Sequence, residues 1–177
     1  MAESFVNAQA RAAGIVTTNS AGAVGVTTNI ITGISTVGIS SGYLVDNTNF
    51  LLGARVTRVD VSKVYVDRDS TNTAAASDLS VKFLGLTSAY TAASKSILIG
   101  GTFANNTTSQ VNLTVEVFDQ SGDKTVGIAH KIPVPTGSSF VISDAGKTLL
   151  EGLDEVRVYS DTAGAIDVNL SILTGVS

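Results

Sequence analysis

The sequence predicts an all-β protein, and three observations support this fold class. Apolar and polar side chains alternate in residues 111–119 and 165–173, as expected for strands that bury one face. Turn-forming residues separate about seven short segments of this kind. No stretch repeats apolar residues at helical spacing over three turns. We therefore expect an antiparallel β-sandwich of the jelly-roll or immunoglobulin-like type, preceded by an extended N-terminal arm and a small β module.

The N-terminal region differs in charge from the rest of the chain. Residues 1–50 contain only Glu3, Arg11 and Asp46 as charged groups. Ala8 to Ala13 could form a short helical turn, and from Gly14 onward Gly, Ser and β-branched residues dominate. A disordered segment is normally polar and charged, which this segment is not. We therefore expect residues 1–30 to form an arm, or a set of strands, that neighbouring subunits cover.

Residues 31–76 are expected to form a separate β module. Five valines between Val56 and Val66 lie on either side of Ser62-Lys63, as in a hairpin of two short strands. Residues 67–78 are polar and small, and they are the best linker candidate in the chain.

Residues 79–177 are expected to form the sandwich domain. The strands expected in it are 79–85, 96–103, 111–119, 125–132, 138–143, 155–159 and 165–173. The turns expected between them carry Gly, Pro, Asp and Ser at 119–123, 133–139, 144–147 and 161–165.

Composition excludes several functional classes. The chain of 177 residues has no cysteine and one histidine, so thiolate zinc sites, disulfides and histidine clusters are not expected. The net charge of −4 gives no basic patch for nucleic acid or anionic lipid. No apolar run reaches the roughly 18 residues of a membrane span. Glu3 stands where a secretory signal would be positive, so we expect a non-secreted chain.

Few residues are candidates for chemistry. His130 would have to serve any Ser-His-Asp arrangement, but it lies within an expected strand, so a structural or surface role is favoured. Asp119 and Asp123 flank Gln-Ser-Gly, which fits either a calcium loop or a plain hairpin turn. Asp67 and Asp69 are weaker candidates for calcium ligands, and they lie in a run of turn-forming residues. Carboxylates that could act as a glycosidase pair cluster at Glu151, Asp154 and Glu155, but this segment is better explained as a turn that enters a strand. We expect no enzymatic activity, no cofactor, and no catalytic, cofactor-binding or metal-binding residue.

Two segments resemble proteins of tailed phages. In residues 32–74, Gly42-Tyr43-Leu44-Val45 and Gly53-Ala54-Arg55-Val56 precede a Ser/Thr/Ala run, as in a small β module of phage structural proteins. The surrounding phrase is similar to virion proteins of phages that infect marine cyanobacteria. Residues 97–173, with Ile-Pro-Val-Pro-Thr-Gly-Ser-Ser at 132–139, resemble a short sandwich domain of virion and tail-associated proteins.

The resemblance implies a virion structural protein that is assembled in the host cytoplasm. We expect a capsid decoration or cement protein that binds the major capsid protein through residues 1–76 and forms a homo-oligomer, with a trimer as the first guess. The alternative is a neck, tail or fibre-associated component. A carbohydrate-binding adhesion module, with Tyr43 or Tyr90 in contact with the glycan, is a third hypothesis. Nucleic acid and membrane are not expected as partners.

Overall fold

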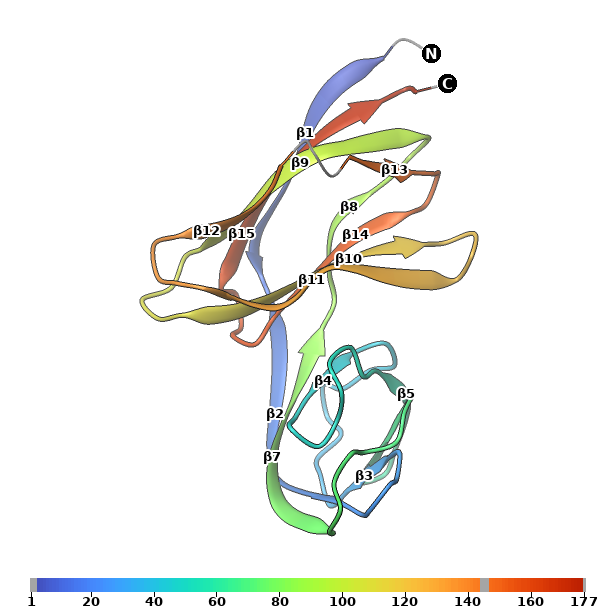
Figure 1. Cartoon of the computed structure of the whole chain (residues 1–177), viewed down its shortest axis with the longest axis vertical. Helices are drawn as coiled ribbons and strands as arrows, with labels where there is room; N and C mark the ends of the chain where they lie inside the picture. The colour runs from blue at the N-terminus through green and yellow to red at the C-terminus, as the bar shows by residue number, and fades with distance from the viewer. Residues whose placement is uncertain (1–2, 144–146, 177) are drawn as a thin grey trace. The chain divides into compact units, whose positions relative to one another are not determined.

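The structure is a computed structural model, and it describes residues 3–143 and 147–176. It confirms the predicted all-β fold class: every regular element in the described residues is a strand, and all strand pairs are antiparallel. Figure 1 labels most of these strands along the chain. Within the described ranges, no helix is long and apolar enough to cross a membrane.

The chain forms two compact units, and the smaller one is inserted into the larger one. The larger unit consists of residues 1–14 and 87–177, and the smaller unit of residues 15–86. The insertion begins after Gly14 and ends before Thr87. These two residues are in contact, because the Gly14 N–H donates a hydrogen bond to Thr87 Oγ1 (3.2 Å). Each unit has its own cluster of buried apolar residues.

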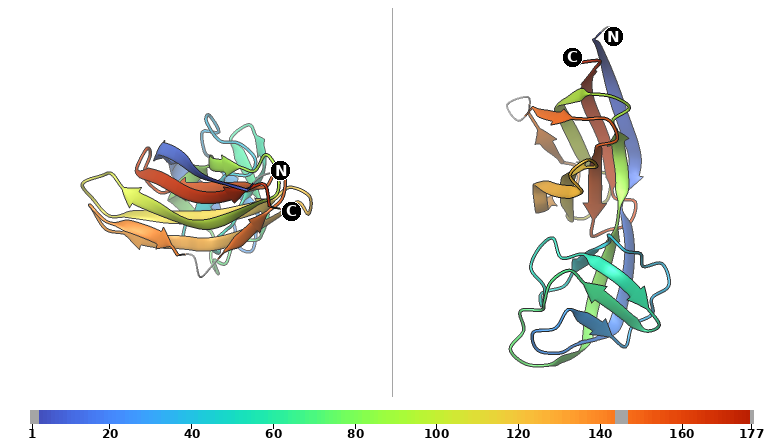
Figure 2. Two further views of the ribbon diagram at one scale, coloured as in Figure 1. Left: turned by 90° about the horizontal axis from the view of Figure 1, so that it is seen from above. Right: turned by 90° about the vertical axis from the view of Figure 1, so that its right-hand side faces the viewer.

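The larger unit is a sandwich of two sheets, which lie one over the other in Figure 2. One sheet has the order β1-β15-β9-β12, with β13 also paired to β9. Its strands are β1 (Ser4–Ala13), β15 (Ile166–Thr174), β9 (Ser96–Asn105), β12 (Ser139–Ile142) and β13 (Thr148–Leu150). The other sheet has the order β11-β10-β14-β8. Its strands are β11 (Lys124–Val134), β10 (Val111–Asp119), β14 (Glu155–Ser160) and β8 (Thr87–Thr91).

The core of the sandwich comes from alternate residues of both sheets. Phe103 and Leu170 on one sheet pack in the same cluster as Leu113 and Val156 on the other. All four side chains are fully buried. Burial of this kind stabilises a fold by about 1.5–3 kcal/mol for each large side chain. The alternation predicted for residues 111–119 and 165–173 therefore matches the observed inward-facing positions.

The smaller unit is one sheet whose two edges meet. The strand order is β4-β7-β2-β3-β6-β5. These strands are β2 (Ile15–Val24), β3 (Ile30–Thr32), β4 (Leu44–Asp46), β5 (Val56–Asp60), β6 (Lys63–Val66) and β7 (Ala76–Gly85). Leu44 forms a bridge with Arg55, and the Val45 N–H donates to the Ala54 carbonyl (2.8 Å). Gly42 and Val56 add bonds of 2.8 and 2.9 Å at the same seam, so the sheet is closed.

The structure corrects the expected N-terminal arm. Residues 4–13 are not a helical turn or a free arm: they form β1, which pairs with the C-terminal strand β15. Val6, Ala8 and Ala10 alternate toward the core side of the sheet, opposite Ile172, Leu170 and Val168. β15 supplies the backbone hydrogen-bond partners that a short helix would otherwise provide. The helical propensity of alanine therefore does not determine the conformation of this segment.

The expected boundaries at residues 30, 76 and 79 also differ from the observed ones. The predicted linker at 67–78 is a loop of the smaller unit followed by the start of β7. The loop is fixed to the rest of that unit, because Ser70 and Thr71 donate backbone hydrogen bonds to Thr28 and Asn49 (both 2.8 Å). The predicted hairpin around Ser62-Lys63 is confirmed as β5 and β6. The expected turn at 144–147 lies largely outside the described residues.

Candidate interaction surfaces

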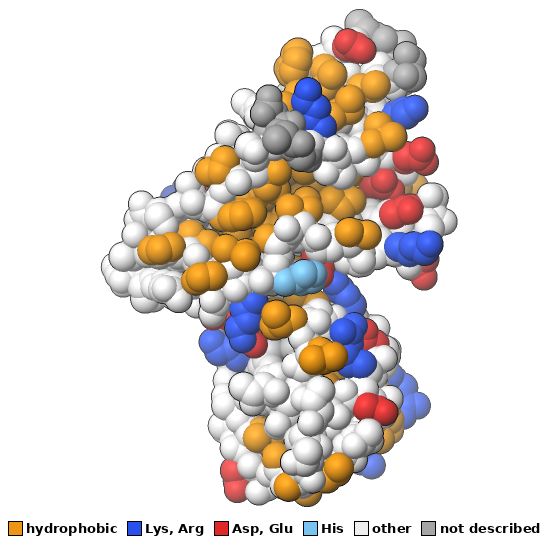
Figure 3. Space-filling view, viewed as in Figure 1, with side chains coloured by type: hydrophobic (Ala, Val, Ile, Leu, Met, Phe, Trp, Pro, Cys, Tyr) orange, Lys and Arg blue, Asp and Glu red, His pale blue; other side chains and the backbone are white. Residues whose placement is uncertain are grey.

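The lone histidine lies in an irregular part of β11. Between the pairs Leu113–Ile132 and Val115–Ala129, β11 has one more residue than β10, which makes a β-bulge. Lys131 in this bulge has a positive φ of 49°, and its N–H donates to Thr114 Oγ1 (3.0 Å). His130 is exposed, and a Cβ at Gly127 would collide with its ring. The structure thus places His130 on the surface, within a strand (Figure 3).

Asp119 and Asp123 lie in the hairpin turn between β10 and β11. Asp119 Oδ1 accepts hydrogen bonds from the Gly122 N–H and the Ser121 hydroxyl, both at 2.8 Å. These two donors, the Gly122 N–H first, hold the pKa of Asp119 below its ordinary value. Asp123 has a φ of 47°, as turn residues often do. The carboxylate of Asp119 therefore shapes the turn, and the plain hairpin reading accounts for this sequence.

The acids at 151–155 form a turn and the start of a strand. Asp154 is buried, and its two carboxylate oxygens accept the Gln120 N–H (3.0 Å) and the Glu151 N–H (2.8 Å). Glu155 begins β14 and pairs with Arg157 (2.9 Å). The predicted turn that enters a strand is therefore confirmed. The structure gives Asp154 a structural role, because it joins two neighbouring turns.

Asp67 organises the loop that follows β6. Its carboxylate accepts the Arg55 N–H (2.9 Å) and two guanidinium bonds from Arg68, the shorter at 2.8 Å. Partial burial opposes ionisation, but the hydrogen bonds from Arg68 and Arg55 outweigh it and lower the pKa of Asp67. No hydrogen bond joins Asp69 to another described residue. Within residues 3–143 and 147–176, no three His, Asp or Glu side chains are grouped as metal ligands.

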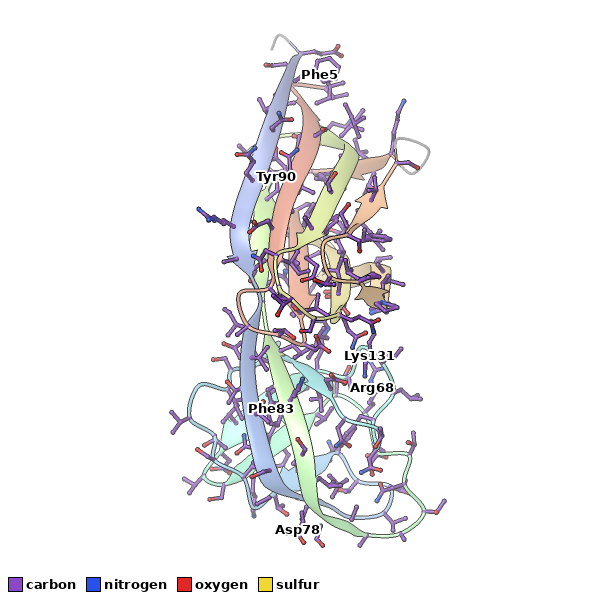
Figure 4. All side chains as sticks on the ribbon, turned by 90° about the vertical axis from the view of Figure 1, so that its left-hand side faces the viewer. Phe5, Arg68, Asp78, Phe83, Tyr90 and Lys131 are labelled. Carbon is purple, nitrogen blue, oxygen red and sulfur yellow. The ribbon has the colours of Figure 1, made fainter. Side chains whose placement is uncertain are left out.

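The outer face of the five-stranded sheet carries an apolar row that the sequence analysis did not identify. Four residues from β1, β15, β9 and β13 lie opposite one another in register: Phe5, Leu173, Ile97 and Leu149. Phe5 is 76% exposed and Leu149 is 51% exposed, and the two residues between them are half-buried. Phe5 lies near the start of β1, where Figure 4 labels it. Only the cross-strand register reveals this row.

A shallow depression with polar and apolar lining lies on the same face. It has a volume of about 380 Å³, and its polar lining comes from Gln9, Arg11, Thr102, Asp167 and Asn169. Gln9 Nε2 donates to Asn169 Oδ1 (3.3 Å), and Asp167 Oδ1 accepts the Ala12 N–H (2.9 Å). Among the described residues, no aromatic side chain lines it.

Exposed apolar side chains are also found at the turns and loops of the smaller unit. Val37 is 82% exposed between β3 and β4, and Val61 is 84% exposed in the β5–β6 turn. Leu51 and Leu52, 61% and 60% exposed, lie between β4 and β5. These apolar side chains lie on three separate loops of the smaller unit.

The two tyrosines considered for glycan binding are each packed into a core. Tyr90 is half-buried against the sandwich core, and its hydroxyl is 3.4 Å from Ser96 Oγ. Tyr43 is half-buried against the core of the smaller unit. The structure therefore presents neither ring as an open stacking platform.

No protein-family model, no curated protein and no solved structure matches this chain.

Proposed function

We propose that this chain is a structural component of a tailed-phage virion, a decoration or cement protein that binds the capsid surface. The observation that carries the proposal is the set of exposed apolar side chains on the loops of the smaller unit: Val37, Leu51, Leu52 and Val61. The resemblance of residues 32–74 and 97–173 to virion proteins supports it. The first segment lies wholly in the smaller unit, and the second lies wholly in the larger unit.

In this proposal the smaller unit contacts the capsid. Each loop leucine or valine contributes about 1.5–3 kcal/mol when a partner buries it completely. Four such side chains on loops of a closed, well-packed sheet offer apolar contacts to a partner, and the backbone of this unit needs little ordering on docking. In this proposal the sandwich supplies the contacts between copies, or it faces solvent.

The first test is copy number in purified particles. Quantitative mass spectrometry compares this protein with the major capsid protein of the source phage. A ratio within a few-fold of the capsid protein is the expected result. A ratio lower by an order of magnitude or more would instead support a neck, tail or fibre position. Absence from the particles would overturn the virion proposal.

The second test asks which unit binds the particle. Val37→Asp and Val61→Asp are made in the full chain and added to particles that lack the protein. We expect both variants to lose binding, because an aspartate in place of valine adds a charge that must be desolvated on docking. Leu149→Asp is the control, since Leu149 is an apolar residue of the larger unit that is also exposed, at 51%. Lost binding of Leu149→Asp alone would contradict the assignment to the smaller unit.

The shallow depression favours a second candidate function, binding of a carbohydrate. Its amide, carboxylate and guanidinium groups can exchange hydrogen bonds with sugar hydroxyls. A glycan array probed with the full chain tests this function, with Asn169→Ala as the variant at the centre of the depression. Binding that survives Asn169→Ala, or no binding to any glycan, would exclude this depression as the site.

A further inference from the structure

β1 is a long strand with one unpaired edge. It spans 10 residues and, among the described strands, it pairs only with β15. Val6 points to the core side of the sheet, opposite the fully buried Ile172, yet Val6 itself is 39% exposed. The edge beside Val6 is therefore uncovered in the single chain. An edge of this kind has backbone N–H and C=O groups free to pair with another strand.

The sequence of β1 lacks most of the devices that prevent strand pairing. It contains no proline, and Arg11 is its only charged residue. Its one irregularity is a bulge near the C-terminal end, where the register shifts between Ala10 and Ala13. Residues 4–10 thus offer a regular, uncharged edge, with Glu3 just before it and Arg11 in the bulge that follows it. Natural proteins usually protect such an edge with charges, prolines or bulges unless it has a partner.

We propose that this partner is β1 of a second copy of the chain, paired antiparallel about a two-fold axis at Asn7. In this register Glu3 of each copy lies opposite Arg11 of the other, and Phe5 lies opposite Gln9. Within the described residues, neither Glu3 nor Arg11 has an ion-pair partner in the single chain. A shift of two residues in either direction leaves both charges without a counter-charge. Charge complementarity therefore selects one register.

The pairing is also consistent with the two faces of the sheet. Phe5, Asn7, Gln9 and Arg11 lie on the outer face, since Val6, Ala8 and Ala10 lie opposite buried residues of β15. In the proposed register each outer residue meets an outer residue, and Val6 meets Ala8 on the core side. Opposite residues of adjacent strands share a face, so the register meets this requirement. The two five-stranded sheets become one continuous sheet.

The pairing makes a closed, two-fold symmetric dimer. Each copy contributes the same strand, so the contact uses up both free edges and leaves none for further growth through β1. The proposed contact has two-fold symmetry, in place of the three-fold symmetry of the trimer expected from the sequence. It does not rest on the proposed virion function, because it concerns the isolated protein in solution.

A disulfide at the axis tests the register directly. The chain has no cysteine, so Asn7→Cys introduces a single thiol per copy on an exposed position. Directly opposite residues have Cα atoms about 4.5–5.5 Å apart, within the range that a disulfide spans. We expect Asn7→Cys in the full chain to give a covalent dimer under mild oxidation, seen on a non-reducing gel.

Gln9→Cys is the matched control on the same face of the same strand. Two copies of residue 9 are offset by four residues in this register, about 14 Å apart, which is too far for a disulfide. We expect no covalent dimer from the Gln9→Cys variant alone. A mixture of the Gln9→Cys and Phe5→Cys variants should give a covalent dimer that joins one copy of each. Equal cross-linking of Asn7→Cys and Gln9→Cys, or none by Asn7→Cys, would overturn the proposal.

Charge exchange tests the complementarity without any covalent link. Glu3→Arg and Arg11→Glu each place like charges together at both symmetric positions. We expect each to raise the dimer dissociation constant, measured by analytical ultracentrifugation, by about tenfold, and the double variant to restore it to within about twofold. A chain that is monomeric at all concentrations, or a double variant no better than the single ones, would contradict the pairing.

Discussion

The two units of this chain treat the edges of their sheets in opposite ways. In the smaller unit, hydrogen bonds between the segments around Leu44 and Arg55 join the first and last strands, so the sheet closes on itself. In the larger unit the sheets stay open, and β1 ends one of them with an unpaired edge. Closure removes the backbone groups through which a sheet can grow, whereas an open edge keeps them. Strand pairing between copies is therefore expected from the larger unit, and side-chain docking from the smaller one.

The units also differ in what holds them together. The core of the sandwich is assembled from long strands of two facing sheets, with Phe103 near its centre and 6.0 Å from Phe140 between ring centroids. The smaller unit has two 10-residue strands, β2 and β7, but its other strands span three to five residues, and its loops are fixed by polar side chains such as Asp67 and Ser70. We therefore expect the sandwich to respond most to core truncation and the smaller unit to respond also to loss of loop hydrogen bonds.

The largest expected effect comes from removing residues 2–30. This deletion takes away β1 from the sandwich and β2 from the middle of the smaller sheet. We expect both units to lose their cooperative structure, because β2 holds β7 and β3 together and β1 covers one end of the sandwich core. Hydrogen exchange followed by peptide mass spectrometry measures the loss in each unit.

A replacement of residues 15–86 is the contrasting variant. Gly14 and Thr87 already meet through a hydrogen bond, so an Asn-Gly turn can join β1 to β8. We expect the sandwich to keep its cooperative unfolding in this variant. If the sandwich unfolds here but survives the deletion of residues 2–30, the division of the chain into these two units is wrong.

Core truncation should separate the two units. Phe103→Ala in the sandwich and Phe83→Ala in the smaller unit each remove a fully buried ring. Each should lower the free energy of unfolding by about 3–5 kcal/mol, and only in its own unit. Denaturant titration with hydrogen exchange as the readout tests this. Equal destabilisation of both units by either variant would show that they unfold as one.

A smaller effect is expected from loss of one loop hydroxyl. Ser70 is buried; its Oγ donates to the Gly25 carbonyl and accepts the Thr28 N–H, both at 3.2 Å. Ser70→Ala leaves the half-buried Thr28 N–H without this acceptor, which should cost about 1 kcal/mol in the smaller unit. Ser20→Ala, at an exposed position of β2, is the control and should stay within about 0.5 kcal/mol. Similar unfolding midpoints for the two variants would contradict this role of Ser70.

Much of the sandwich could be predicted from the sequence, because its signals are local. In β10 and β15 the apolar residues alternate strictly, and the predicted strands coincide with the observed ones to within a residue. The hairpin of β5 and β6 has the same local signature. The small strands β3, β4 and β13 span only three residues each, too few for an alternation to stand out.

The interaction surfaces could not be predicted in the same way, because they depend on pairing between distant segments. Phe5 and Leu173 lie side by side only because the first strand pairs with the last. The closed sheet likewise depends on contacts of Leu44 with Arg55, which no local pattern indicates. β1 itself was missed since Ala8 and Ala10 are small, helix-favouring residues whose strand conformation comes from pairing with β15.

The smallest expected effect concerns the acid sensitivity of the smaller unit. The hydrogen bonds from Arg68 and Arg55 lower the pKa of Asp67 in the folded state, so folding favours its ionised form. The resulting stabilisation is fully present above the unfolded pKa of about 3.9 and is lost as the pH falls from there through the lower folded value. Asp67→Asn should therefore lower the unfolding midpoint of the smaller unit at pH ~7 more than at pH ~3.

The effect of Asp67→Asn should be modest, because the side chain is about a third exposed and solvent screens its ion pair with Arg68. Asp69→Asn makes the same chemical change two residues away, at a carboxylate with no hydrogen bond to another described residue. Urea titrations of both variants at the two pH values compare them. If Asp67→Asn lowers the unfolding midpoint equally at both pH values, the carboxylate acts through its shape rather than its charge. The loop would then depend on packing, as the sandwich does.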